Sequence, residues 1–350
     1  MSIQLRVLRS LATAMVLTVG IVGCQTPEPE GAEPSGATEA TGDLPGTGVA
    51  VTPGYGVLEE RFQTEVVNIG LERLGYTINE GKELEYAPLV TEVGNGGIDF
   101  MAGHWEKNQT AFFENGGGDE KLEKVGSIIV ATQGYMIDKA TADEHNITNI
   151  EQLTDPTIAA LFDSDGDGKA NLTGCPTGWG CELVIEHHLD TYGLRNTVQH
   201  DQGKYFALIA DSITRVKQNE PALFYTWTPL WVSNVLVPDE DIVWLEVPYT
   251  DLPESQGEMS EADTTADGKN LGFAIEQIYI LANQEFVDNN PAATTLMSLV
   301  KIPVDDVSAQ SQLIQEGEDS LEDIRGHAEA WVEKNQALFD GWVEQAIAVQ

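Results

Sequence analysis

The chain has 350 residues, of which 41% are hydrophobic and 21% charged, so it is long enough for about two domains and has an ordinary globular composition. Acidic residues outnumber basic ones by 57 to 18, which gives a formal net charge of −39. Phosphate backbones and anionic membrane faces repel such a polyanion, so the composition argues against nucleic-acid binding.

The N-terminus is predicted to be a lipoprotein signal peptide covering residues 1–23. Arg6 and Arg9 precede an apolar stretch at 11–22, which has the length of a signal h-region but is short for a membrane span. The stretch ends in Gly23 and Cys24, which resembles a bacterial lipobox with Cys24 as the acylated first mature residue. A plain signal peptide followed by an incidental cysteine is the alternative.

Residues 24–48 are rich in Pro, Glu, Gly, Thr and Ala and show no apolar periodicity, which predicts a flexible tether. Acyl chains on Cys24 would hold the tether at a membrane without a spanning helix. We therefore expect an exported protein, periplasmic or at the cell surface, that is attached to a membrane by lipid.

Hydrophobic periodicity predicts alternating strands and helices, an α/β pattern with two halves and no internal repeat. In chain order, the expected elements are a strand at 48–53, a helix at 59–74 closed by Gly75, strand pieces at 76–78 and 85–86, a helix at 87–93, a strand at 98–102, a β-branched stretch at 126–137, loop and short helix at 147–162, helices at 182–194 and 205–217, strands at 221–227, 242–248 and 277–282, and helices at 291–300, 308–315 and 323–348.

An acidic loop begins at Asp163 and has carboxylates at alternate positions with a glycine at the sixth, like the first half of an EF-hand calcium loop. The candidate calcium ligands are Asp163, Asp165, Asp167, Lys169 through its backbone carbonyl, and Asn171. Gly174 stands where a bidentate glutamate is expected, so Glu182 or backbone oxygens would have to complete the shell. A metal-free Asp/Gly turn is the alternative.

The remaining cysteines, Cys175 and Cys181, close a seven-residue loop, and export permits them to form a disulfide. A zinc site is the rival interpretation, but further ligands at regular spacing are missing. The sequence also lacks a nucleophile elbow, a metalloprotease helix, a phosphate-binding loop and a dinucleotide fingerprint, so no enzyme is predicted.

Three of the seven tryptophans lie beside glycines or at the ends of predicted strands, where core residues are uncommon: Trp105, Trp179 and Trp227. Trp244, Trp331 and Trp342 instead follow strand or helix periodicity, which burial explains. Trp179 lies between two glycines inside the cysteine loop, so its indole and the neighbouring backbone N–H groups are well placed to contact a ligand.

Three segments, 155–163, 173–182 and 225–234, closely resemble the ProX family, the periplasmic glycine betaine/proline betaine-binding proteins of ProU-type osmoprotectant ABC importers. The likeness runs from about Asp43 to Val343. It implies a two-lobed periplasmic-binding-protein fold of type II with the ligand cleft between the lobes. Lobe 1 would comprise 49–135 and 276–350, lobe 2 would comprise 136–275, and strands near 133–137 and 272–280 would cross between them.

The resemblance also implies a ligand site. Trp105, Trp179 and Trp227 match the family's tryptophan cage for a quaternary ammonium, and the N–H groups of Gly180 and Cys181 match those that hold the ligand carboxylate. The family has a histidine donor where this chain has Gln109, whose amide can donate instead. The implied partners are a betaine, an ABC permease and its ATPase, with no required cofactor. Choline, carnitine or another quaternary ammonium is the alternative ligand, and a calcium-dependent structural lipoprotein is the alternative of a different class.

Overall fold

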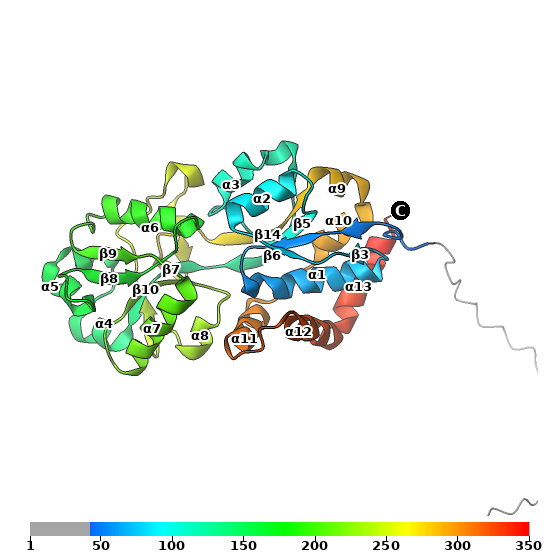
Figure 1. Ribbon diagram of the computed structural model, residues 1–350. Helices are drawn as coiled ribbons and strands as arrows, with labels where there is room; N and C mark the ends of the chain where they lie inside the picture. The colour runs from blue at the N-terminus through cyan, green and yellow to red at the C-terminus, as the bar shows by residue number, and fades with distance from the viewer. Residues whose placement is uncertain (1–42, 350) are drawn as a thin grey trace, which may run out of the picture. The chain divides into compact units, whose positions relative to one another are not determined.

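The computed structural model describes residues 43–349, and its strands form two five-stranded sheets, one in each lobe (Figure 1). The α/β prediction is therefore confirmed. The predicted signal peptide, Cys24 and residues 24–42 of the predicted tether lie outside the described residues. In the part of the chain that the structure describes, every helix is too short or too polar to span a lipid bilayer.

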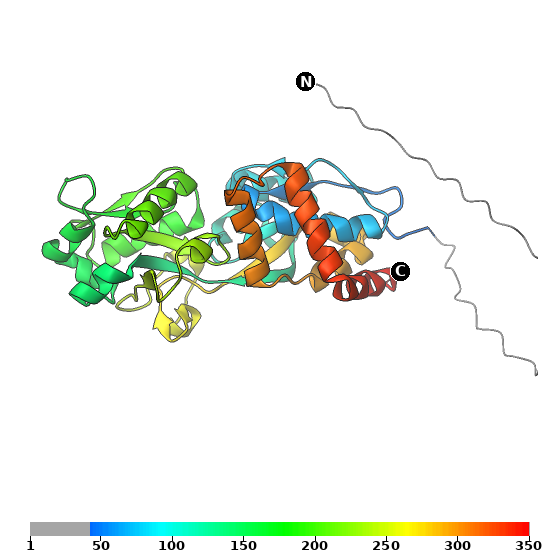
Figure 2. The same cartoon turned by 90° about the horizontal axis from the view of Figure 1, so that it is seen from below.

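Lobe 1 contains the sheet with the strand order β4-β2-β5-β14-β6. Its strands are β2 (Pro53–Tyr55), β4 (Lys82–Glu83), β5 (Phe100–Trp105), β6 (Leu122–Ala131) and β14 (Glu276–Asn283), while β1 (Ala50–Val51) pairs separately with β3 (Thr77–Ile78). Its helices are α1 (Arg61–Arg73), α2 (Tyr86–Gly94), α3 (Thr110–Asn115), α9 (Gln284–Asn289), α10 (Pro291–Leu299), α11 (Val304–Gln315), α12 (Leu321–Lys334) and α13 (Gln336–Ile347). Seen from below, α11, α12 and α13 lie along one face of this lobe (Figure 2).

Lobe 2 contains the sheet with the strand order β11-β7-β10-β8-β9. Its strands are β7 (Gln133–Asp138), β8 (Ala170–Thr173), β9 (Val198–Asp201), β10 (Leu223–Trp227) and β11 (Ile242–Trp244), and β12 (Thr265–Ala266) pairs with β13 (Lys269–Asn270). Its helices are α4 (Lys139–His145), α5 (Pro156–Ala159), α6 (Gly180–Thr191), α7 (Tyr205–Lys217) and α8 (Val232–Val235).

Each lobe has its own apolar core. The chain passes between the lobes on neighbouring segments, since Glu276 pairs with Ala131 where β14 meets β6. The first crossing is at Thr132, between β6 and β7, so the predicted boundary at residue 135 is three residues late. The β-branched run at 126–137 hides the change of sheet, because each half of it satisfies a strand pattern. The return crossing enters β14 at Glu276.

Other boundaries also differ from the predictions. The predicted tether ends too late, because 43–48 already lie on lobe 1, where the Gly46 N–H donates to the Leu74 carbonyl over 2.8 Å. The predicted strand at 85–86 is instead the start of α2. The single helix predicted at 323–348 is two helices separated at Asn335, which neither proline nor glycine marks.

Candidate functional site

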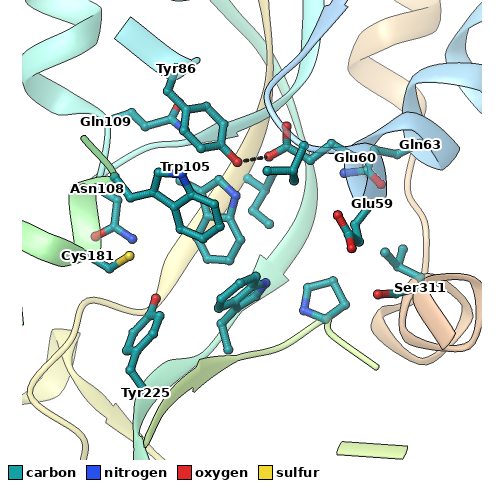
Figure 3. Close-up of a pocket in the computed structure, with 17 residues that line it drawn as sticks. Glu59, Glu60, Gln63, Tyr86, Trp105, Asn108, Gln109, Cys181, Tyr225 and Ser311 are labelled. Carbon is teal, nitrogen blue, oxygen red and sulfur yellow. Dashed lines mark hydrogen bonds between the residues drawn. The ribbon is translucent and has the colours of Figure 1, made fainter. Parts of the chain in front are cut away.

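A pocket lies where the two lobes meet, and aromatic rings form much of its wall (Figure 3). Lobe 1 contributes residues from β5, α1, α2 and α11, while lobe 2 contributes the start of α6 and the end of β10. The carboxyl ends of β5 and β10 both point into it, which is where open α/β sheets bind ligands. All six predicted ligand residues line this pocket: Trp105, Gln109, Trp179, Gly180, Cys181 and Trp227.

The three predicted cage tryptophans come together in this pocket. Trp105 ends β5, Trp179 is the N-cap residue of α6, and Trp227 ends β10. The Trp227 ring centroid lies 6.3 Å from that of Trp105 and 5.8 Å from that of Trp179, with interplanar angles of 90° and 70°. The rings therefore face a common space from different directions.

Two of the three tryptophans that are predicted to be buried are buried in the structure. Trp331 and Trp342 are buried in the lobe 1 core, at 7% and 6% exposure. Trp244 was predicted to be buried, but it is only half-buried, because β11 is an edge strand of its sheet.

Three tyrosines support the indoles, and the sequence did not single them out. The Tyr205 ring centroid lies 4.7 Å from that of Trp227 and 6.1 Å from that of Trp179, and its hydroxyl donates to the Tyr225 carbonyl over 2.9 Å. The Tyr86 ring from lobe 1 meets Trp179 edge-on at 6.1 Å. Aromatic pairs favour particular ring orientations, so these contacts help to orient the indoles.

The cysteine loop brings the start of α6 to the pocket. Cys175 and Cys181 form the predicted disulfide, with 6.0 Å between their Cα atoms. Within residues 43–349, no side chain caps the N-terminus of α6, and the N–H groups of Gly180 and Cys181, the first two helical residues, have no intrahelical partner. An uncapped helix N-terminus has a partial positive charge and free donors, which suit a carboxylate.

Lobe 1 approaches Gly180 very closely. A Cβ atom added to Gly180 would overlap the carbonyl oxygen of Asn108 and lie 2.7 Å from the Asn108 Cβ. Glu276 holds this part of lobe 1 by accepting the N–H groups of Lys107 and Asn108 over 2.9 and 2.8 Å. Burial raises the pKa of Glu276 to about 7. Glycine at position 180 is thus required for the lobes to meet as they do.

Two adjacent glutamates form an acidic side of the pocket that the sequence did not reveal. Burial raises the pKa of Glu59 and of Glu60 to about 7, and Glu60 accepts a hydrogen bond from the Tyr86 hydroxyl over 2.9 Å. In Figure 3, Glu59 and Ser311 lie on the opposite side of the indoles from Gln109 and Cys181. Their position in the sequence could have indicated a ligand site, because both glutamates lie between the carboxyl end of a strand and the start of a helix.

Residues 164–168 of the predicted calcium loop are exposed, and the loop contributes no residue to this pocket. Ligand oxygens of Asp163, Asp165 and Asp167 lie within 4.8 Å of one another. The Asp163 carboxylate accepts the N–H groups of Gly166 and Gly168 over 2.7 and 2.9 Å, and these bonds lower its pKa.

The other predicted calcium positions are less favourable to a metal. The Asn171 side-chain oxygen accepts from the Ser164 N–H and hydroxyl, and Glu182 bonds Gln202. Space beside Gly174 is filled by the His200 ring. Of the predicted ligands, only the three aspartates have side-chain oxygens placed closely enough to share a calcium ion. Lys169 follows them in the same loop.

Comparison with known proteins gives a consistent family. The model of the OpuAC family, described as the substrate binding domain of ABC-type glycine betaine transport systems, matches residues 51–334. The glycine betaine/proline betaine-binding periplasmic protein of Escherichia coli (strain K12) is 46% identical over 310 residues, which cover 88% of this chain and 93% of that protein. The glycine betaine-binding periplasmic protein OusX of Dickeya dadantii (strain 3937) is 45% identical over 312 residues, with the same coverage.

Solved structures share the fold at low sequence identity. A glycine betaine, L-proline-binding protein from Borrelia burgdorferi aligns with a TM-score of 0.65 and 20% identity, covering 86% of this chain and 99% of that chain. Lactococcal OpuAC, in a closed conformation with glycine betaine, aligns with a TM-score of 0.62 and 18% identity, covering 84% and 99%. These neighbours are type II periplasmic binding proteins, so the predicted fold class is confirmed.

Proposed function

Since this chain belongs to the OpuAC family, the substrate-binding domains of ABC-type glycine betaine transport systems, we propose that it captures glycine betaine or proline betaine in the pocket between its lobes. The observation that carries the proposal is the convergence of three indoles and an uncapped helix N-terminus on one pocket. Its family consists of transport proteins rather than enzymes.

The indoles suit the ammonium end of a betaine. A trimethylammonium has no N–H to donate, so hydrogen bonds cannot recognise it, whereas the negative faces of aromatic rings attract its diffuse charge. Each desolvated cation–π contact is worth about 2 kcal/mol or more, so contacts with Trp105, Trp179 and Trp227 together offset the dehydration of the cation. The ionised form of nearby Glu59 adds a favourable charge.

The start of α6 suits the carboxylate end. The N–H groups of Gly180 and Cys181 have no intrahelical partner, and the helix dipole favours a negative charge there. Gln109 adds a neutral side-chain donor on the same side of the indoles (Figure 3). Neutral donors hold a carboxylate less tightly than an arginine pair does, which permits release to a transporter.

Titration of the mature protein with glycine betaine, proline betaine, choline, carnitine and proline tests this function. We expect saturable binding of the two betaines by calorimetry and tryptophan fluorescence, and no binding of proline, which lacks a quaternary nitrogen. Preference for choline would show that the carboxylate is not recognised. Failure of every quaternary ammonium to bind would reject the proposal.

The loop at 163–171 supports a separate proposal of a structural calcium ion. Asp163, Asp165 and Asp167 would supply carboxylate ligands, with the Lys169 carbonyl as a further candidate. Asn171 would have to give up its hydrogen bonds with Ser164 to join them. We expect calcium to raise the midpoint of thermal unfolding and EGTA to lower it again, with betaine affinity unchanged. If calcium does not change the midpoint of thermal unfolding, the loop is a metal-free turn. If EGTA abolishes betaine binding while the protein stays folded, the loop takes part in the function.

We further propose export and delivery to an ABC permease and its ATPase, because the curated relatives are periplasmic and the sequence has a lipobox-like Cys24. Closure of the lobes on the ligand would present a closed form to the permease. Lipid attachment predicts that labelled palmitate is incorporated into the mature protein and that Cys24→Ser abolishes the labelling. Equal labelling of the variant would place the acyl chains elsewhere.

A further inference from the structure

The side chain of Gln109 is held from behind by His104. The Nδ1 atom of His104 lies 2.9 Å from the Oε1 atom of Gln109, and the two side chains are 0% and 2% exposed. His104 precedes Trp105 on β5, and neighbouring strand residues point to opposite faces. Trp105 therefore faces the pocket, while His104 packs against the Phe113 ring, 5.9 Å between centroids, and does not line the pocket.

The direction of this hydrogen bond depends on the tautomer of His104, and Oε1 of Gln109 faces the ring. A glutamine Oε1 only accepts, so Nδ1 of His104 must carry the proton. Burial, with Lys124 nearby, lowers the pKa of His104 to about 3, so the ring is neutral at physiological pH. Its Nε2 then has only a lone pair, which has no partner among the described residues.

The opposite arrangement is less favourable. If the Gln109 amide donated to Nδ1, the proton of the neutral ring would lie on Nε2 and form a buried N–H without an acceptor. An orphaned buried donor is rarer and costlier than an unfilled lone pair. The Nδ1–H tautomer is therefore favoured, and it turns the oxygen of the Gln109 amide away from the pocket.

This orientation leaves the Gln109 NH₂ group available to a ligand. The Nε2 atom of Gln109 has no hydrogen-bond partner in the described part of the chain, and Gln109 lines the pocket on the side of Cys181 (Figure 3). Without His104, the amide could rotate by half a turn and offer its oxygen, which would repel a carboxylate.

We propose that His104 is a positioning residue that fixes the Gln109 amide with its NH₂ group toward the ligand carboxylate. The pair thereby favours betaines over quaternary ammonium compounds without a carboxylate. It also supplies a donor whose charge stays constant, unlike a histidine donor at position 109. This inference rests on the proposed function, because it requires a carboxylate ligand in the pocket.

A double-mutant cycle tests the coupling. His104→Phe keeps a ring of similar size but removes the donor, and Gln109→Leu removes the amide. One lost neutral hydrogen bond costs about 1.5 kcal/mol, so each variant should raise the glycine betaine Kd roughly tenfold, and the double variant should be no weaker than Gln109→Leu alone. His104→Asn, which retains an N–H donor, should restore most of the affinity.

The outcomes separate this inference from the proposed function. If the wild-type protein binds no quaternary ammonium compound, the proposed function itself fails. If it binds and the two single losses add in the double variant, His104 does not act through Gln109.

A second measurement does not depend on the folding of a variant. A ¹⁵N–¹H correlation spectrum of the wild-type imidazoles should show His104 in the Nδ1–H tautomer at neutral pH. The Nε2–H tautomer would overturn the inference.

Discussion

Replacing Trp179 with alanine should abolish most betaine binding while leaving the protein folded. The indole is half-buried at the pocket, and its removal deletes a cation–π contact worth at least about 2 kcal/mol, so the Kd for glycine betaine should rise roughly 30-fold or more. The midpoint of thermal unfolding should change little, because the disulfide and the aromatic contacts of Trp227 with Tyr205 remain. Calorimetry and thermal unfolding measure the two effects.

Trp342→Ala is the matched control, with the same chemical change in the core of lobe 1. Trp342 is 6% exposed and stacks on Trp331 with 6.4 Å between ring centroids. Its truncation should cost about 3–5 kcal/mol of unfolding free energy, while the protein that remains folded should bind betaine normally. Equal losses of affinity from the two variants would show that the cage is assigned to the wrong tryptophans.

The second large effect is expected from Gly180→Ala. The added methyl group would overlap the Asn108 carbonyl across the interface between the lobes. Overpacking of this kind costs about 1–3 kcal/mol. Because the overlap lies between the lobes, this cost destabilises their closed arrangement, and the glycine betaine Kd should rise roughly 10- to 100-fold. The fold of each lobe should be unaffected, since Gly180 has no left-handed backbone that alanine would resist.

Gly326→Ala provides the control for this substitution. Gly326 lies in α12, where an added Cβ meets nothing within 4 Å, so binding should match the wild type and helix stability should increase slightly. If Gly180→Ala also binds like the wild type, the lobes do not approach this closely in the ligand-bound state.

The sequence predicts the elements well where periodicity is strong and local. The apolar spacing at 59–74 gives α1 to within two residues at its start and one at its end, because one face of that helix packs on the core of lobe 1. Predictions from periodicity fail where a change of sheet or a break in a helix does not alter the hydrophobic pattern. The strand change at Thr132 and the helix break at Asn335 leave the hydrophobic pattern intact, so both were missed.

The site follows the same rule. The tryptophans and the α6 N-terminus were predicted from local motifs together with the family resemblance, and the structure brings all of them to one pocket. Glu59, Tyr86, Tyr225 and Ser311 come from segments far apart in the chain, and only the packing of the lobes unites them. The orientation of Gln109 depends on a buried neighbour, His104, whose contact no sequence pattern announces.

The central claim is the place and direction of the bound ligand, and a crystal structure of the mature protein with glycine betaine tests it most directly. We predict the trimethylammonium among the rings of Trp105, Trp179 and Trp227, with the carboxylate within hydrogen-bond distance of the Gly180 and Cys181 N–H groups. A betaine bound in the reverse direction, or outside the three indoles, would contradict the account.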